Sequence, residues 1–256
     1  MKKIAIVIVF SLLCLNLWAE DNQEKVRRNI FILDVGKAFS NAKMAIRVPN
    51  ADKYSSFHDV DKFDTTGNVS FSYLRRLKAL DNKLSLGGEI FILAGVGDRV
   101  YYEEYKAIMG NDAYQPIHYD DQGRDYTAKE WKYNSGLGAS FLVNYEILKT
   151  KSFDLSTTLG IGGLAHSMSI NYTGYRECIL FICHYTRDSK SYGDTTVLAK
   201  IGLLGYYNIT RWLAFGLNSY YIYTEPAKFH FKDNDVSYKV KNNGIITTNV
   251  SLRMQF

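Results

Sequence analysis

The chain has 256 residues, of which 46% are apolar and 22% charged, with a formal net charge of +5. Its 20 tyrosines exclude a disordered chain, because such chains lack aromatic and β-branched residues. After the first 20 or so residues no apolar run exceeds about eight residues, whereas a membrane-spanning helix needs about 20, which excludes a polytopic helical membrane protein.

Residues 1–19 have the three parts of a secretory signal peptide. Lys2 and Lys3 supply the positive charge, Ile4–Leu15 is apolar, and cleavage is expected after Ala19. A lipoprotein signal acylated at Cys14 is the alternative, although the residue before that cysteine is bulkier than such signals carry. Cleavage leaves residues 20–256 as one expected domain with 29 bases (31 − 2) and 26 acids. That mild, dispersed charge argues against nucleic acid as a partner.

Eight segments of the mature chain alternate apolar and polar residues with a period of two, which predicts β-strands. In chain order they lie near residues 29–36, 66–75, 84–96, 131–146, 153–165, 197–207, 213–223 and 246–256. The first is the least regular, because Ala42, Met44, Ile46 and Val48 also alternate and could extend it or form a small extra hairpin.

Short and long connections alternate between these segments. The short ones lie near residues 78–83, 149–152 and 208–211, and the long ones near residues 37–65, 98–129, 167–194 and 224–243. All three prolines fall in long connections, so none interrupts a strand. This order predicts antiparallel strands that run up and down in sequence.

Alternation alone does not tell whether the apolar face points into a core or into lipid. A soluble barrel such as a lipocalin would turn it inward, whereas an outer-membrane barrel turns it outward between aromatic girdles. The opposite face is rich in Gly, Ser, Thr and Asn, which favours the membrane interpretation. We therefore expect an all-β fold, an eight-stranded antiparallel up-and-down transmembrane β-barrel with short periplasmic turns and long extracellular loops. The expected girdle residues are Tyr73, Tyr145, Phe153, Tyr207 and Phe256 near the short turns, and Trp131, Tyr133, Tyr221 and Tyr223 near the long loops.

The last strand carries a more specific sign. It ends in Phe256, with Met254, Leu252 and Val250 at alternate positions before it, and it resembles the terminal strand of Gram-negative outer-membrane proteins. In that family the C-terminal Phe is read by the barrel-assembly machinery, so the resemblance implies this machinery as a partner and these four residues as the assembly signal.

The mature chain as a whole resembles the small barrels of the OmpA-transmembrane, OmpW and opacity-protein group, in architecture rather than in a diagnostic motif. The resemblance implies an integral protein of the outer membrane. It also implies contact with outer-membrane lipid and lipopolysaccharide, and loops that face the outside of the cell.

Side chains largely fill an eight-stranded barrel, which argues against a general diffusion porin. Because a buried charge needs a partner, we expect the interior charges to pair and plug the barrel. Alternatively, Glu89 and Lys200, both near mid-depth, line a constriction for a small solute. The charges placed on the interior face are Glu89, Lys132, Glu146, Asp154, Lys200 and Arg253.

Two cysteines, Cys178 and Cys183, remain after signal cleavage, and an even pair in an exported chain predicts a disulfide. A zinc site would need more ligands than these two and His184. The expected bridge brackets four large apolar residues, which either pack onto neighbouring loops or form a stapled contact tip for adhesion. These residues are Ile179, Leu180, Phe181 and Ile182.

The long loops indicate the function, since long segments without a clear helical pattern are usually functional or disordered. We expect a non-enzymatic protein that displays its loops to a host or other extracellular ligand, with no cofactor, metal or catalytic residue. The alternatives are an OmpW-like narrow channel for small apolar solutes and a lipid A-modifying enzyme. For the enzyme, His166 would have to activate Ser167 or Ser169, which alternate to the opposite strand face.

Overall fold

The computed structural model describes residues 28–95, 99–119, 124–179, 182–232 and 235–256. Eight strands form a closed antiparallel ring in the order β1-β4-β5-β8-β9-β10-β11-β14, in which β14 pairs again with β1. Each overlaps one of the eight predicted segments, and β8, β9 and β10 extend well beyond theirs. Their bounds are β1 Asn29–Phe39, β4 Thr65–Arg76, β5 Leu84–Gly95, β8 Asp125–Lys149, β9 Phe153–Ile179, β10 Ile182–Asn208, β11 Leu213–Thr224 and β14 Ile245–Gln255.

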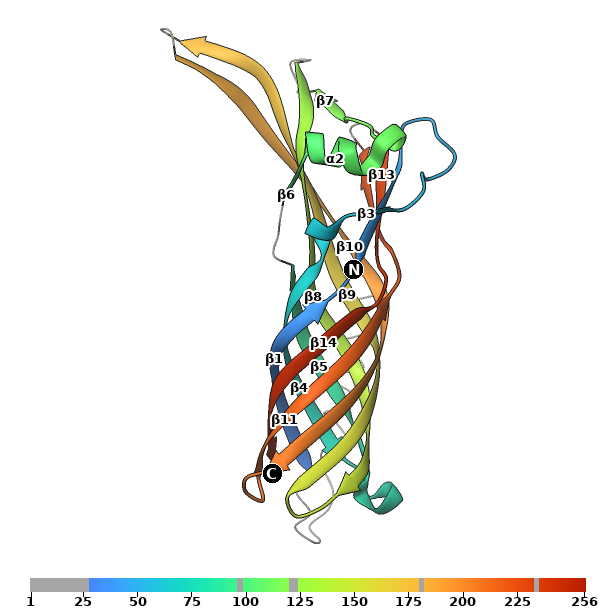
Figure 1. The fold of residues 1–256 in the computed structure, drawn as a ribbon, viewed down its shortest axis with the longest axis vertical. Helices are drawn as coiled ribbons and strands as arrows, with labels where there is room; N and C mark the ends of the chain where they lie inside the picture. Colours follow the sequence, from blue (N-terminus) through green and yellow to red (C-terminus); the bar gives the residue numbers. More distant parts are fainter. Residues whose placement is uncertain (1–27, 96–98, 120–123, 180–181, 233–234) are drawn as a thin grey trace.

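The three short connections lie together at one end of the ring, which is also where the chain ends (Figure 1). One of them is the single turn η2 (Ala79–Asn82) between β4 and β5. The two ends of the described chain close the ring there, since Asn29 N donates to Phe256 O at 3.0 Å and Phe256 N donates to Asn29 O at 2.9 Å. The long connections all lie at the opposite end.

The ring is apolar outside and polar inside. On β11 and β14, Leu217 and Val250 are 67% and 59% exposed, whereas their neighbours Asn218 and Ser251 are each 1% exposed. This is the arrangement of a barrel in lipid rather than of a soluble barrel. We call the exposed apolar surface of the ring the apolar belt; it includes Leu33, Val35, Val69, Phe71, Ile90, Ile92, Leu159, Ile161, Ile201, Leu203, Leu217 and Val250.

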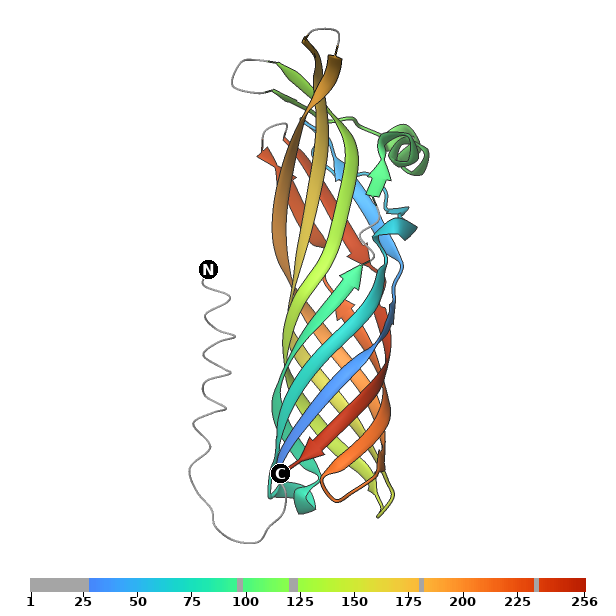
Figure 2. The same ribbon diagram turned by 90° about the vertical axis from the view of Figure 1, so that its left-hand side faces the viewer.

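Beyond the apolar belt the chain continues into a folded region that we call the extension, made of the described parts of residues 40–64, 99–135, 166–194 and 225–244. Strands β8, β9 and β10 run on into it without a break, and β9 and β10 reach farthest from the barrel (Figures 1 and 2). A second sheet has the order β12 (Ala227–Phe231), β13 (Val236–Asn242), β2 (Ala42–Arg47) and β3 (His58–Asp59). The remaining elements are β6 (Arg99–Tyr101), β7 (Ile117–Tyr119), α2 (Tyr102–Met109), η1 (Asp61–Phe63) and η3 (Gly110–Asp112).

The extension has a hydrophobic core of its own, separate from the residues that pack inside the barrel. Of the helices that the structure describes, none has the length and hydropathy to cross a membrane. The core of the extension includes Met44, Ile46, Phe63, Tyr105, Trp131, Tyr133, Tyr172, Phe229, Phe231 and Tyr238.

The long connections are therefore more ordered than the sequence indicated. The described residues of the predicted third loop, 167–179 and 182–194, are paired in β9 and β10. The second connection contains α2, which the absence of a clear helical pattern did not predict. The segment around Met44 does not extend β1 but forms β2 of the second sheet. The fourth connection contains two paired antiparallel strands, β12 and β13.

A bulge in β8 overturns part of the predicted alternation. The pairing of β8 with β9 shifts by one residue between Ser135 and Gly138, so residues before the bulge point to the opposite side. Trp131 and Tyr133, expected in the membrane girdle, are instead 0% and 2% exposed in the core of the extension. Lys132, expected in the barrel interior, points away from that core and is half-buried, so its placement among the interior charges was wrong.

Candidate functional site

The middle of the barrel is occupied by an ion pair. Lys200 Nζ on β10 lies 2.6 and 2.7 Å from the two carboxylate oxygens of Glu89 on β5, and Ser140 Oγ donates to Glu89 Oε2 at 3.0 Å. Both charged residues are buried, at 5% and 3% exposure. The two residues placed near mid-depth pair with each other, as the expectation of paired interior charges requires, rather than lining an open passage.

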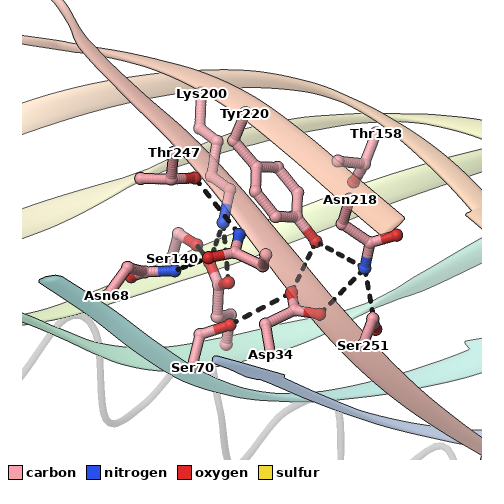
Figure 3. A network of polar contacts seen from close by, with 12 residues as sticks. Asp34, Asn68, Ser70, Ser140, Thr158, Lys200, Asn218, Tyr220, Thr247 and Ser251 are labelled. Carbon is pink, nitrogen blue, oxygen red and sulfur yellow. Dashed lines mark hydrogen bonds and ion pairs between the residues drawn. The ribbon is translucent and has the colours of Figure 1, made fainter. Parts of the chain in front are cut away.

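A second acid, Asp34 on β1, extends this network (Figure 3). Its carboxylate accepts hydrogen bonds from Asn218 Nδ2 at 2.8 Å, from the Tyr220 hydroxyl at 2.8 Å and from Ser70 Oγ at 3.3 Å. Asp34 is fully buried, yet it was not among the predicted interior residues. Its position between Leu33 and Val35, both exposed on the outer face, is the sequence signal that places it inside.

Tyr220 joins the two acids into one cluster. Its hydroxyl binds Asp34, while Lys200 Nζ lies 3.7 Å from the centroid of its ring, a cation–π contact. Gly202 on β10 makes room for that ring, because a side chain at this position would collide with it. The cluster therefore crosses the lumen from β1 through β11 to β10 and β5.

The end of the barrel with the short turns holds a second layer of paired charges. Arg76 donates to Glu146 at 2.9 Å, and Arg253 pairs with Asp154 and donates to Asn208 Oδ1 at 2.9 Å. Glu146, Asp154 and Arg253 were predicted to lie inside, and they do; Arg76 was missed. A cavity of about 10 Å³ between these pairs is about the space that one water molecule needs.

His166 lies where the barrel meets the extension, and it contacts neither serine of the enzymatic hypothesis. One ring nitrogen is 2.7 Å from the Tyr133 hydroxyl, and the other is 2.8 Å from Thr196 Oγ1. Ser167 points to the outer face, as the alternation predicted. His166 is thus an interior hydrogen-bonding residue between the barrel and the extension.

Aromatic side chains hold the extension together. Trp131 stacks on Tyr105 with ring centroids 4.2 Å apart, and Trp131 Nε1 donates to the Tyr238 hydroxyl at 3.1 Å. Burial raises the pKa values of the Tyr105 and Tyr238 hydroxyls above the ordinary value for tyrosine. These contacts join α2, β8 and β13, which makes the extension a packed body rather than a set of independent loops.

The remaining predicted residues lie at the two ends of the molecule. Cys183 is the backbone partner of Cys178 near the end of the β9–β10 hairpin, and Ile182 is the partner of Ile179. Leu180, Phe181 and the expected signal peptide, residues 1–19, lie outside the described residues. The proposed assembly residues on and after β14 follow the outer face, where Val250 and Phe256 are 59% and 56% exposed and Leu252 and Met254 are half-buried.

No protein-family model matches the chain, and no curated protein matches it significantly. Solved structures similar to it include Neisserial surface protein A, which is 10% identical over 89% of this chain and 97% of that chain with a TM-score of 0.41. The outer membrane protease OmpT of Escherichia coli is 9% identical over 93% and 99%, with a TM-score of 0.46. OprG of Pseudomonas aeruginosa is 9% identical over 90% and 98%, with a TM-score of 0.42.

Similarities this distant assign no function, so the class of protein follows from the molecule itself. A closed ring of eight antiparallel strands leaves no unpaired edge within the membrane, its outer surface is apolar and its interior is polar. The chain therefore has the fold of an outer-membrane β-barrel.

Proposed function

We propose that this protein is a closed, non-enzymatic outer-membrane barrel that anchors the extension on the outside of the cell for interaction with a host or another extracellular ligand. The observation that carries the proposal is the combination of a lumen filled by paired charges with an extension that has its own hydrophobic core. An OmpW-like channel would need a passage where these pairs lie.

The lumen is occupied at three levels. Arg76 and Glu146 pair near the short turns, Glu89 and Lys200 pair at mid-depth, and the core of the extension lies above His166. Separating a buried ion pair costs much free energy, because it leaves each charge without a counter-ion in a medium of low dielectric constant. A solute would have to disrupt all three levels to cross.

The β9–β10 hairpin is the feature of the extension best placed to meet a partner. Its strands run beyond the second sheet (Figure 1), and the expected Cys178–Cys183 bridge would hold its end in one conformation. A preorganised contact surface loses less conformational entropy when it binds. In this proposal the bracketed residues 179–182 form the contact tip, the signal peptide directs export, and the C-terminal residues from Val250 to Phe256 serve the barrel-assembly machinery.

The decisive experiment shortens the hairpin while keeping the barrel. Arg176 and Tyr185 are backbone partners, so residues 177–184 can be replaced by Asn-Gly, which forms the tight turn that such a hairpin needs. Cells that display the intact protein should bind host cells or matrix, and cells that display the shortened variant should not. Heat-modifiable migration of both proteins on gels checks that the barrel is equally folded.

Planar-bilayer recording distinguishes the channel alternative. The intact protein is expected to give no reproducible single-channel steps. Steady conductance that changes when Glu89 or Lys200 is replaced by Ala would overturn the closed-barrel proposal in favour of a narrow conduit. An altered lipid A mass spectrum that depends on His166 would instead establish the enzymatic alternative.

A further inference from the structure

The outward face of the second sheet is strongly basic. The opposite face of this sheet packs on the core of the extension through Phe229, Phe231 and Tyr238. Alternation along β12, β13 and β2 therefore turns the lysines and arginine of these strands and of the residue after β12 outward. The outward cations are Lys43, Arg47, Lys228, Lys232, Lys239 and Lys241.

Two pairs of these lysines face each other directly. Lys228 on β12 is the cross-strand partner of Lys239 on β13, and Lys241 on β13 is the partner of Lys43 on β2. Like charges at directly opposed positions destabilise a sheet. Lys43 of the second pair has the Asp59 carboxylate as a counter-ion, whereas the salt bridges of the described residues include none with Lys228 or Lys239 of the first pair.

The positive charges of this face are only partly compensated by neighbouring groups. Lys43 pairs with Asp59 at 3.0 Å, and Lys239 Nζ lies 4.1 Å from the centroid of the Tyr54 ring. Among the described residues, neither Lys228 nor Lys241 has an ion-pair partner. Their ammonium groups are free to bind an external anion.

The basic face lies directly above the apolar belt and on the same side of the wall. Phe39, Tyr223 and Ile246 are exposed by 57%, 51% and 48% at the upper edge of the belt. Lys43 follows Phe39 by four residues, Lys228 follows Tyr223 by five, and Lys241 precedes Ile246 by five. At about 3.3 Å per residue these lysines lie at most roughly 17 Å beyond the belt, next to the polar layer of the leaflet.

We infer that this face binds the phosphate groups of lipopolysaccharide in the leaflet around the barrel. Neighbouring strands are about 4.8 Å apart and alternate residues about 6.7 Å apart, so two or three ammonium groups can approach one phosphate. The position beside the lipid surface favours lipid phosphates over a soluble polyanion. The inference rests on the outward orientation of the extension proposed above.

The test measures binding and stability of the full mature protein in neutral detergent micelles, to which lipopolysaccharide is added. The variant Lys228→Gln/Lys239→Gln removes one opposed lysine pair. The matched control, Lys106→Gln/Lys151→Gln, removes two exposed lysines from α2 and from a short turn. The loss of two lysines near an anionic surface should weaken binding about 30-fold, whereas the control should bind like the original protein.

The thermal stability of the Lys228→Gln/Lys239→Gln variant distinguishes ligand binding by these lysines from a merely structural role. Without lipopolysaccharide the variant should be as stable as the original protein or more so, because a repulsion is removed. With lipopolysaccharide the original protein should gain the larger increase in Tm, since at a given concentration a tighter ligand stabilises the folded state more. The same lipopolysaccharide stripped of phosphate by hydrofluoric acid should give neither effect.

Three results would overturn the inference: equal affinity of the variant and the original protein, undiminished binding of dephosphorylated lipopolysaccharide, or binding of heparin without binding of lipopolysaccharide. The last would assign the face to a soluble polyanion. Micelles have no sidedness, so binding there does not depend on which way the extension faces. Labelling of Lys106 on intact cells by an impermeant amine reagent tests the orientation separately.

Discussion

Lys200 and Glu89 are 111 positions apart in the sequence, and they meet inside the barrel with both carboxylate oxygens within 2.7 Å of the ammonium nitrogen. Neither strand could place its charge there alone, because each residue would be an unpaired ion in a buried site. The pair therefore couples the register of β5 to that of β10, across the two strands that separate them in the ring.

Breaking this pair from one side should destabilise the barrel strongly. Lys200→Met leaves the Glu89 carboxylate buried without its counter-ion, with a hydrogen bond from Ser140 Oγ, and we expect a loss of about 3–5 kcal/mol in the free energy of unfolding. The double variant Glu89→Leu/Lys200→Met removes both charges and should recover most of that loss. Urea unfolding in lipid vesicles, followed by tryptophan fluorescence, measures the free energies.

The comparison of the single and double variants is the informative part. Lys151→Met, at an exposed turn, controls for the loss of a lysine as such. If the double variant were as unstable as the single one, the packing of the two side chains rather than their charges would hold the lumen together.

The bulge in β8 decides where Trp131 points. Deletion of Gly136 removes the extra residue, so that Trp131 and Tyr133 should turn outward and Lys132 inward. In a Trp212→Phe background the emission of Trp131, which is fully buried, should then shift to longer wavelength. The extension should also become sensitive to protease while the barrel stays folded.

Gly136→Ala is the matched control for this deletion. It keeps the number of residues, and a Cβ at this position would lie 3.5 Å from the Ala165 carbonyl oxygen, an ordinary contact. Unchanged Trp131 emission after the deletion would mean that the core of the extension, not the bulge, sets the orientation of the strand.

The sequence sufficed for the ring and for most of its interior charges, because both follow from a period of two. Lys200, Asp154 and Arg253 each lie between apolar residues of the outer face, and Glu89 precedes the exposed Ile90, so the alternation along each strand places these charges inside. Asp34 follows the same rule, but it lies on the strand whose limits were least regular. The alternation did not predict the bulge in β8. Trp131 and Tyr133 are favourable both in lipid and in the core of the extension, and hydropathy does not distinguish the two environments.

The folded extension depends on contacts between distant parts of the chain. Trp131 and Tyr238 are 107 positions apart, and β2 pairs with β13 across almost 200 residues. No local pattern reports such pairings. The same holds for the basic face, whose opposed lysines become visible only when the register of β12, β13 and β2 is known.

Alkaline conditions should loosen the extension. Burial raises the pKa values of Tyr105 and Tyr238, whereas in the unfolded chain a tyrosine ionises near pH 10. Above that pH the unfolded state loses protons that the folded state retains, so stability is complete below about pH 10 and falls as the pH rises. The free energy of unfolding should decrease less steeply with pH in Tyr238→Phe. Unfolding is followed by Trp131 fluorescence in the Trp212→Phe background.

Tyr238→Phe also removes the acceptor for Trp131 Nε1, and we expect it to lower stability at neutral pH by about 1–3 kcal/mol. The loss of stability at neutral pH and the change of stability with pH are separate quantities, and one series of unfolding measurements at different pH values gives both. Tyr119→Phe, at a position that is 60% exposed, is the matched control. An unchanged slope in Tyr238→Phe would assign the alkaline transition to groups other than this tyrosine.

We expect a disulfide between Cys178 and Cys183 near the end of the β9–β10 hairpin. The two residues are opposed backbone partners in neighbouring strands, a placement from which a cross-strand bridge can form. The mature protein purified from membranes should take up no thiol label before reduction and two labels after it, and Cys183→Ser should take up one without reduction. Because the bridge closes a short loop, we expect it to contribute about 2 kcal/mol to the hairpin. Two labels on the unreduced protein would show that the end of the hairpin is held by backbone pairing alone.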